Sequence, residues 1–171
     1  MSIYVFKLYD PVFPELFEKE KDRLKSFLKK DYLIEHVGST SVSGLGGKGI
    51  IDICLEIPEQ DKEEVWKDLE KAGYILRPNL TSDMHVTHTI FLPDPIEGER
   101  KYNLHVREPN SPWLKEALAF RDYLRKNPED VKRYSDIKEK AAIEAKGNRD
   151  IYQSIKKSVI DEIYSKAMKD S

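Results

Sequence analysis

Residues 35–57, with the sequence EHVGSTSVSGLGGKGIIDICLEI, decide the fold of this chain of 171 residues. The last eight of them, residues 50–57, are mostly branched and apolar and are followed by Pro58, which predicts a strand buried in a sheet. A shorter strand is expected at residues 32–37, just before the glycine-rich loop. The segment therefore predicts two strands joined by a loop of about a dozen residues.

Outward from this segment, apolar periodicity and Pro or Gly breaks predict the other elements. Further strands are expected at residues 3–8, 74–77, 86–92 and 102–106, and helices at residues 15–30, 59–72, 112–126, 128–145 and 149–168. The fold class is therefore α+β, as a single domain in which residues 1–110 form a mixed β-sheet part with flanking helices and residues 111–171 form a C-terminal helical layer. In the last helix Ile151, Ile155, Val159 and Ile163 repeat every four residues and predict a buried seam.

The composition excludes several classes of protein. The chain has 29 basic and 31 acidic residues, so no global positive field draws it to nucleic acid, which is an unlikely partner. One cysteine allows neither an internal disulfide nor a Cys-rich zinc site. The sequence has neither the pattern of a signal peptide nor an apolar run near the ~20 residues of a membrane helix, so we expect a cytoplasmic protein with no membrane contact.

The loop partly matches the sequence patterns of two glycine-rich phosphate-binding motifs, the dinucleotide fingerprint and the P-loop, but it does not meet their requirements. Gly44, Gly46 and Gly49 have the spacing of the dinucleotide fingerprint, but that fingerprint opens a helix, whereas a strand follows Gly49 here. A P-loop needs a glycine five residues before Gly47 and a serine or threonine after Lys48, and neither is present. Both interpretations are excluded.

Gly38, Ser39 and Asp52 together predict a phosphate and metal site. Gly38 lets a ligand approach the backbone because no Cβ stands in the way, and the hydroxyl of Ser39 and the turn amides at Thr40 can donate to phosphate oxygens. Asp52, in mid-strand, can ligate Mg²⁺ or Mn²⁺ that bridges those oxygens, and Lys48 can hold phosphate as a point charge. The alternatives are a structural turn capped by Ser39 and an Asp52 that pairs with Lys48 or an arginine.

Several side chains of the expected helices are candidates for the same ligand. Arg121 suits bidentate recognition of phosphate. Tyr134 with Lys138, and Tyr152 with Lys156, are pairs at i and i+4, so each pair lies on one helix face, where tyrosine can stack on a base and lysine can reach phosphate. The alternatives are a salt bridge for Arg121 and helix packing for the two pairs.

The chain resembles the GrpB family, which is placed in the nucleotidyltransferase superfamily. The matching stretches, in the same order, are Tyr9-Asp10-Pro11, Phe13-Pro14, residues 35–45, residues 48–53, Leu104-His105-Val106, residues 120–125 and the two tyrosine–lysine pairs. The resemblance implies a nucleotidyltransferase-like mixed sheet with flanking helices. The family usually has alanine at Ser41 and proline at Ser43 and Gly49, and these departures loosen the loop.

The carboxylate set of an active nucleotidyltransferase is incomplete. Such an enzyme carries two acids two residues apart on the strand and a third on a neighbouring strand, but here Cys54 and His105 occupy the second and third positions. Glu56 shares the face of Asp52 but lies about 13 Å away along a strand, too far to share one metal. The expected ligands of a metal are thus Asp52 and His105.

The sequence supports two functions of different classes. One is a metal-dependent nucleotidyltransferase with Asp52 as its catalytic carboxylate, acting on a nucleotide or another phosphorylated small molecule. The other is a noncatalytic nucleotide- or phosphometabolite-binding module with a regulatory or accessory role, which the missing carboxylates favour.

Overall fold

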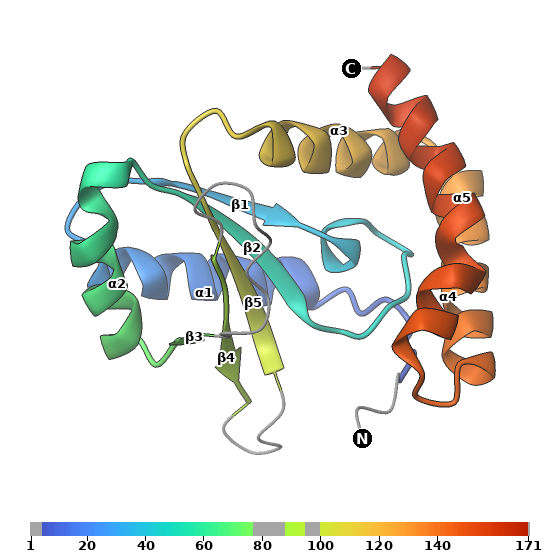
Figure 1. The fold of residues 1–171 in the computed structure, drawn as a ribbon, viewed down its shortest axis with the longest axis horizontal. Helices are drawn as coiled ribbons and strands as arrows, with labels where there is room; N and C mark the ends of the chain where they lie inside the picture. The colour runs from blue at the N-terminus through green and yellow to red at the C-terminus, as the bar shows by residue number, and fades with distance from the viewer. Residues whose placement is uncertain (1–4, 77–87, 95–99, 171) are drawn as a thin grey trace.

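The computed structural model describes residues 5–76, 88–94 and 100–170, and a five-stranded sheet lies at its centre (Figure 1). The strands are β1 Leu33–Val37, β2 Ile51–Glu56, β3 Ile75–Leu76, β4 His88–Pro93 and β5 Arg100–Arg107. The helices are α1 Phe13–Phe27, α2 Lys62–Lys71, α3 Pro112–Lys126, α4 Pro128–Glu144 and α5 Arg149–Lys169, with short 3₁₀ turns η1 Ser39–Ser41 and η2 Glu59–Asp61. The α+β class expected from the sequence is confirmed.

The sheet is mixed, with strand order β1-β2-β5-β4-β3. β2 runs antiparallel to β1 and parallel to β5, and the remaining neighbours, β5 with β4 and β4 with β3, are antiparallel. β2, which has the longest run of apolar residues, thus lies inside the sheet rather than at its edge. This is expected because a strand with few polar residues is usually buried on both faces. The parallel partner β5 brings residues about fifty positions away beside Asp52, whose register partner is Asn103.

The two faces of β2 have different neighbours. Ile51, Ile53 and Leu55 point into the main core, where they pack against side chains of α1 and α2. The alternate residues Asp52 and Cys54 point to the opposite face, because successive strand side chains alternate. That face is covered by α3, which Figure 1 shows on the side of β1 and β2 away from α1. The candidate site therefore lies on the face of the sheet under α3.

The C-terminal helices begin where the sequence predicts. Pro112 and Pro128 open α3 and α4, and the side chain of Asn148 caps α5 by accepting from the amides of residues 150 and 151. The predicted seam on α5 is only partly buried, since Ile163 is fully covered whereas Ile151 is 44% exposed. A strict four-residue spacing turns about 40° per step around a helix, so the row leaves the packed face before it reaches the first turn.

The N-terminal segment is attached to the loop between β1 and β2. Part of the strand expected at residues 3–8 lies outside the described residues, and what is described is an isolated bridge in which Lys7 and Gly47 exchange two backbone hydrogen bonds. Among the described residues, no helix is long and apolar enough to cross a membrane.

Candidate functional site

Asp52 is the single acid of the predicted phosphate and metal site. Its Oδ1 accepts a hydrogen bond from Asn103 Nδ2 at 3.0 Å and lies 3.1 Å from His105 Nε2. Burial raises the pKa of Asp52, but the hydrogen bonds from His105 and Asn103 and the charge of Lys138 outweigh it, so its pKa is below the ordinary value. Because Asp52 is ionised, Nε2 of His105 must carry the proton of this bond. His105 therefore acts on Asp52 as a hydrogen-bond donor.

The position two residues after Asp52 cannot supply a second metal ligand in this arrangement. Cys54 is buried and packs with Val37 and Leu114 beneath α3. Burial raises the pKa of its thiol to about 12, so the thiol stays neutral and apolar in its contacts. Asp52 thus lacks the second carboxylate, two residues along the strand, that a two-metal site needs.

The Gly38 turn brings the loop directly against this carboxylate. Gly38 has a φ of 74°, and a Cβ on it would stand 2.5 Å from Asp52 Oδ2. Glycine is required here both for the backbone conformation and for the close approach. The next residue, Ser39, begins η1 and is only partly covered. Of the predicted residues, Gly38 and Asp52 are therefore in direct contact.

Buried hydrogen bonds hold η1 in place. His36 Nε2 lies 3.0 Å from Thr40 Oγ1, and its ring stacks on Phe17 with centroids 4.5 Å apart. Burial lowers the pKa of His36 to about 4, so the ring is neutral at physiological pH. Ser41 Oγ donates to the Gly38 carbonyl at 2.6 Å. Thr40 therefore shapes the loop through its side chain, whereas the Ser39 hydroxyl lies against Gly47.

Arg121 supports the same loop from α3. Its Nη1 donates to Glu35 Oε2 at 3.0 Å and to the His36 carbonyl at 2.9 Å, and its Nε donates to Asp122 at 2.8 Å. The salt bridge that the sequence allowed as an alternative is therefore present. Two carboxylates neutralise this guanidinium, which fixes the end of β1 rather than leaving an unpaired charge for phosphate.

Lys138 reaches the loop from α4. It is 6% exposed, its Nζ donates to the Gly46 carbonyl at 3.2 Å, and it lies over the Tyr134 ring, 4.1 Å from the centroid. Burial and the charge of Lys156 lower its pKa to about 7, although Asp52 acts in the opposite direction. No ion pair links Lys138 to a carboxylate anywhere in residues 5–76, 88–94 and 100–170. A buried ammonium with so little compensation makes Lys138 a candidate residue for binding an anion.

Two more lysines complete what we call the lysine cluster, defined as Lys48, Lys138 and Lys156. Lys156 lies 4.5 Å and Lys48 5.8 Å from the centroid of the Tyr152 ring, so both ammonium groups gather on one tyrosine. Burial lowers the pKa of Lys156 to about 8, and the charges of Lys48 and Arg149 add to this effect. The two predicted tyrosine–lysine pairs therefore converge on the loop, with the rings packed against the lysines.

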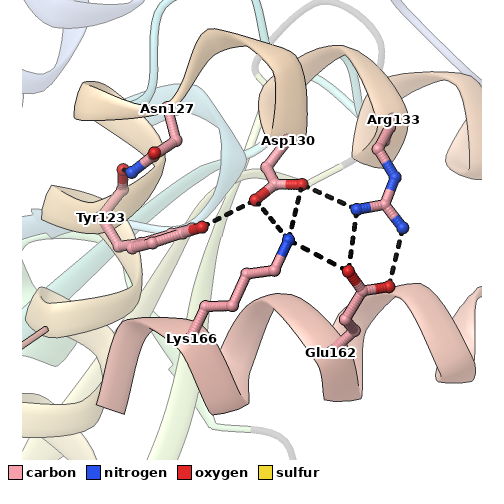
Figure 2. Close-up of polar contacts among 6 residues, drawn as sticks. All are labelled: Tyr123, Asn127, Asp130, Arg133, Glu162 and Lys166. Carbon is pink, nitrogen blue, oxygen red and sulfur yellow. Dashed lines mark hydrogen bonds and ion pairs between the residues drawn. The ribbon is translucent and has the colours of Figure 1, made fainter. Parts of the chain in front are cut away.

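A network of ion pairs fixes the helices that carry Lys138 and Lys156 (Figure 2). Asp130 of α4 accepts from Tyr123 at 2.7 Å, from Arg133 at 2.8 Å and from Lys166 of α5 at 3.2 Å. Arg133 also donates to Glu162 of α5 at 2.7 and 3.0 Å. Because these bonds join α3, α4 and α5, they set the position of Lys156 on α5 relative to Lys138 on α4.

A divalent cation fits this site only as a partner of bound phosphate. Asp52 Oδ1 is engaged by Asn103 and His105, so Oδ2 is the oxygen left to face a metal beside Gly38. Within the described parts of the chain, no group of three or more His, Cys, Asp or Glu side chains could hold a metal ion. Mg²⁺ accepts one carboxylate when substrate phosphates and water complete its shell, so one such ion is compatible with the donors and two are not.

Sequence reasoning missed three residues of the site. Asn103 is the register partner of Asp52 on β5, Ser135 Oγ accepts from the Gly46 amide at 3.1 Å, and Gly47 lies between Ser39 and Lys138. Ser135 stands one helical turn before Lys138, so the spacing carried a signal that could have been used. Nothing local in the sequence could place Asn103 beside Asp52, because the pairing of β5 with β2 is nonlocal.

The chain belongs to the GrpB family, because the family model described as GrpB protein matches residues 5–166. It is 38% identical over 162 residues to the UPF0157 protein BH1888 of Halalkalibacterium halodurans, covering 93% of this chain and 80% of that protein. The crystal structure of the conserved protein GrpB from Enterococcus faecalis superposes with a TM-score of 0.82 at 31% identity, over 97% of this chain and 98% of that one.

The fold is also weakly similar to that of an enzyme of known structure, the Cid1 poly(U) polymerase. It has a TM-score of 0.46 at 14% identity and covers 78% of this chain and 45% of that one. A likeness of this size says nothing about activity.

Proposed function

We propose that this protein binds a phosphorylated small molecule, with a nucleotide as the first candidate, at the loop between β1 and β2. The phosphates lie against Gly38 and Ser39 on one side and the lysine cluster on the other. The single observation that carries the proposal is Lys138, a 6% exposed ammonium beside Ser39 that no carboxylate pairs among the described residues. Such a charge is costly to bury alone, and a bound anion offsets the cost.

The other predicted residues have supporting roles in this proposal. Lys156 and Lys48 gather at Tyr152 and extend the positive region along the loop, so a ligand with more than one phosphate matches it better than a monophosphate. Thr40 and Arg121 hold the loop rather than touch the ligand. One Mg²⁺ or Mn²⁺ on Asp52 Oδ2 would supply further positive charge to phosphates already bound, and His105 would orient that carboxylate.

Of the two functions that the sequence allows, binding without nucleotidyl transfer has the better support. In-line transfer through two metals needs a clamp on both the attacking and the leaving oxygen. Here Asp52 stands alone, because the neighbouring position is the buried, neutral thiol of Cys54. A noncatalytic nucleotide- or phosphometabolite-binding module fits these side chains without further assumptions.

The test is a thermal unfolding screen of the intact chain with ATP, GTP, CTP, UTP and pyrophosphate, each with MgCl₂, and with the matching nucleosides as controls. A ligand at a hundredfold excess over its Kd stabilises the folded state by about 2.7 kcal/mol. For a chain of this size that is a rise in Tm of roughly 5–10 °C.

The variant pair Lys156→Gln and Lys157→Gln makes the screen specific for the site. The two lysines are neighbours on α5, but Lys157 is exposed and pairs with Asp161, whereas Lys156 lies over Tyr152. We expect Lys156→Gln to lower the affinity roughly tenfold or more, and Lys157→Gln to leave it unchanged. The proposal is wrong if none of the phosphorylated compounds shifts the Tm, or if both variants respond alike.

A further inference from the structure

The glycine loop, which we define as residues 44–49, lies directly on the buried ammonium of Lys138. The Gly46 carbonyl accepts from Lys138 Nζ at 3.2 Å, and a Cβ on Gly47 would stand 3.6 Å from the same nitrogen. The side chain of Ser39 fills the space beside Gly47. Because Lys138 is 6% exposed, a ligand reaches its ammonium only after one of the groups that cover it has moved.

The glycine loop has more freedom to move than the other groups around Lys138. Tyr134 and Lys156 belong to α4 and α5, which the network of ion pairs joins. In the loop, four of six residues are glycine, the residue with the greatest backbone freedom. Access to Lys138 is therefore expected through a change in the loop rather than a separation of the helices.

The N-terminal strap, which we define as residues 5–8, holds the glycine loop in place. Lys7 and Gly47 exchange two backbone hydrogen bonds, at 2.6 and 2.9 Å, in an isolated bridge. The Phe6 ring packs on Gly46, where an added Cβ would stand 2.6 Å from its Cε2 atom. One bridge and one ring are few contacts, and segments held by few buried contacts open at low free-energy cost.

We propose that the strap and the glycine loop form a latch over Lys138, and that the closed latch and the bound ligand exclude each other. This inference rests on the proposed function, because it describes how a ligand gains access to the same site. In the closed latch the Gly46 carbonyl engages the ammonium, and a phosphate oxygen replaces that carbonyl when the latch opens. The measured affinity then depends on the fraction of protein in which the latch is open.

A disulfide between the strap and the loop tests whether the latch must open. A Cβ on Gly49 would stand 3.9 Å from Lys7 Cβ, within the range of about 3.5–4.5 Å that a disulfide spans. Cysteine is strained at Gly49, whose φ is 73°, so the oxidised and reduced forms of one protein, Lys7→Cys with Gly49→Cys, are compared. The native Cys54 is buried and does not compete for the new thiols.

Isothermal titration of these proteins with ATP and with pyrophosphate in MgCl₂ measures the effect of the disulfide. We expect the oxidised form to bind at least roughly tenfold more weakly than the reduced form. The single variant Lys7→Cys, treated with the same oxidant, should bind like wild type. Thermal unfolding without ligand shows that each protein is folded before it is titrated.

Phe6→Ala perturbs the latch in the opposite direction and does not depend on the strained cysteine. Removing the ring makes opening less costly, so the affinity for ATP should rise by about three- to tenfold. Leu8→Ala is the matched control, because Leu8 lies exposed on the same strap. In wild-type protein, ATP should speed hydrogen exchange at the amides of Lys7 and Gly47, which the bridge protects while the latch is closed.

The other outcomes separate this inference from the proposed function. Equal affinities of the oxidised and reduced forms would overturn the latch and leave the proposed function standing. A Phe6→Ala variant that binds more weakly than wild type would also overturn the latch, because the strap would then support the site rather than close it. If the double variant does not fold, Phe6→Ala and Leu8→Ala decide between the same outcomes. If wild-type protein binds neither compound, the proposed function fails and the inference fails with it.

Discussion

Replacing Lys138 by methionine should make the ligand-free protein more stable at neutral and mildly acidic pH. The ammonium is 6% exposed beneath the loop, and burial together with Lys156 lowers its pKa from 10.5 to about 7. A lowered lysine pKa means that the protein disfavours the charged form. Methionine has a similar length and no charge, so the variant keeps most of the packing and removes this penalty.

The size of the stabilisation in Lys138→Met and its dependence on pH follow from the lowered pKa of Lys138. One pKa unit corresponds to about 1.4 kcal/mol, so a shift from 10.5 to about 7 implies a cost on the order of 5 kcal/mol while the lysine is charged. Between pH 7 and 10.5 the unfolded chain binds more protons than the folded protein at this group. The folded state therefore gains stability as pH rises through that window, and the cost is fully present below pH 7. From pH 6 to pH 9 the advantage of the variant should shrink by about 2–3 kcal/mol.

Urea unfolding of wild type, Lys138→Met and Lys140→Met between pH 6 and pH 9 measures this effect. The buffers must contain no phosphate, because phosphate would compete for the proposed site. The exposed Lys140 lies on the same helix, and its variant should reproduce the wild-type pH profile. A Lys138→Met variant that is less stable than wild type throughout, or whose advantage does not change with pH, would show that the lysine is not held as a strained charge.

Three further predictions concern the ligand and the helices that hold the site. A bound phosphate should raise the pKa of Lys138 again, so affinity for pyrophosphate should fall by up to about tenfold per pH unit from pH 7 upward, and a flat titration series would contradict this. Asp52→Asn should abolish the gain in ATP affinity that Mg²⁺ brings while leaving the binding in EDTA in place; a gain that persists would exclude Asp52 as the metal ligand. Asp130→Asn should lower the free energy of unfolding by about 2–3 kcal/mol because it weakens three partly buried contacts of the network, whereas exposed Asp136→Asn should change it by less than about 0.5 kcal/mol in the same urea assay, and equal losses would refute the role of the network.

The sequence predicted the elements well because their signals are local. The run of branched residues that forms β2 and the prolines that open α3 and α4 act on their own neighbourhoods, and the structure places those elements within a residue or two of the expected limits. The seam on α5 was a partial failure, because Ile151 is 44% exposed. Periodicity shows which residues share a face, but it does not show how far along the helix a partner extends.

In the candidate site, too, the residues joined by local sequence could be predicted, and the contacts between distant segments could not. Gly38, Ser39 and Asp52 were recognisable as a set because a short loop joins their strands, and the structure brings Asp52 Oδ2 against Gly38. Arg121 was a candidate through the family resemblance, with a salt bridge to its neighbour Asp122 as the alternative, but its partners on β1, Glu35 and the His36 carbonyl, could be identified only in three dimensions.

The sequence by itself determined the order of strands and helices, the glycine turn and the lone acid of the site, since each depends on residues close together in the chain. Only the tertiary structure decided that Lys138, on a helix whose next two residues are also charged, is buried against Gly46 and faces Ser39 across Gly47. The burial of a charge depends on what packs around it, and here the packing comes from α5 and from a loop about ninety residues earlier. The burial of the Lys138 charge, which points most directly to function, therefore arises from contacts between distant segments and cannot be found from the local sequence pattern.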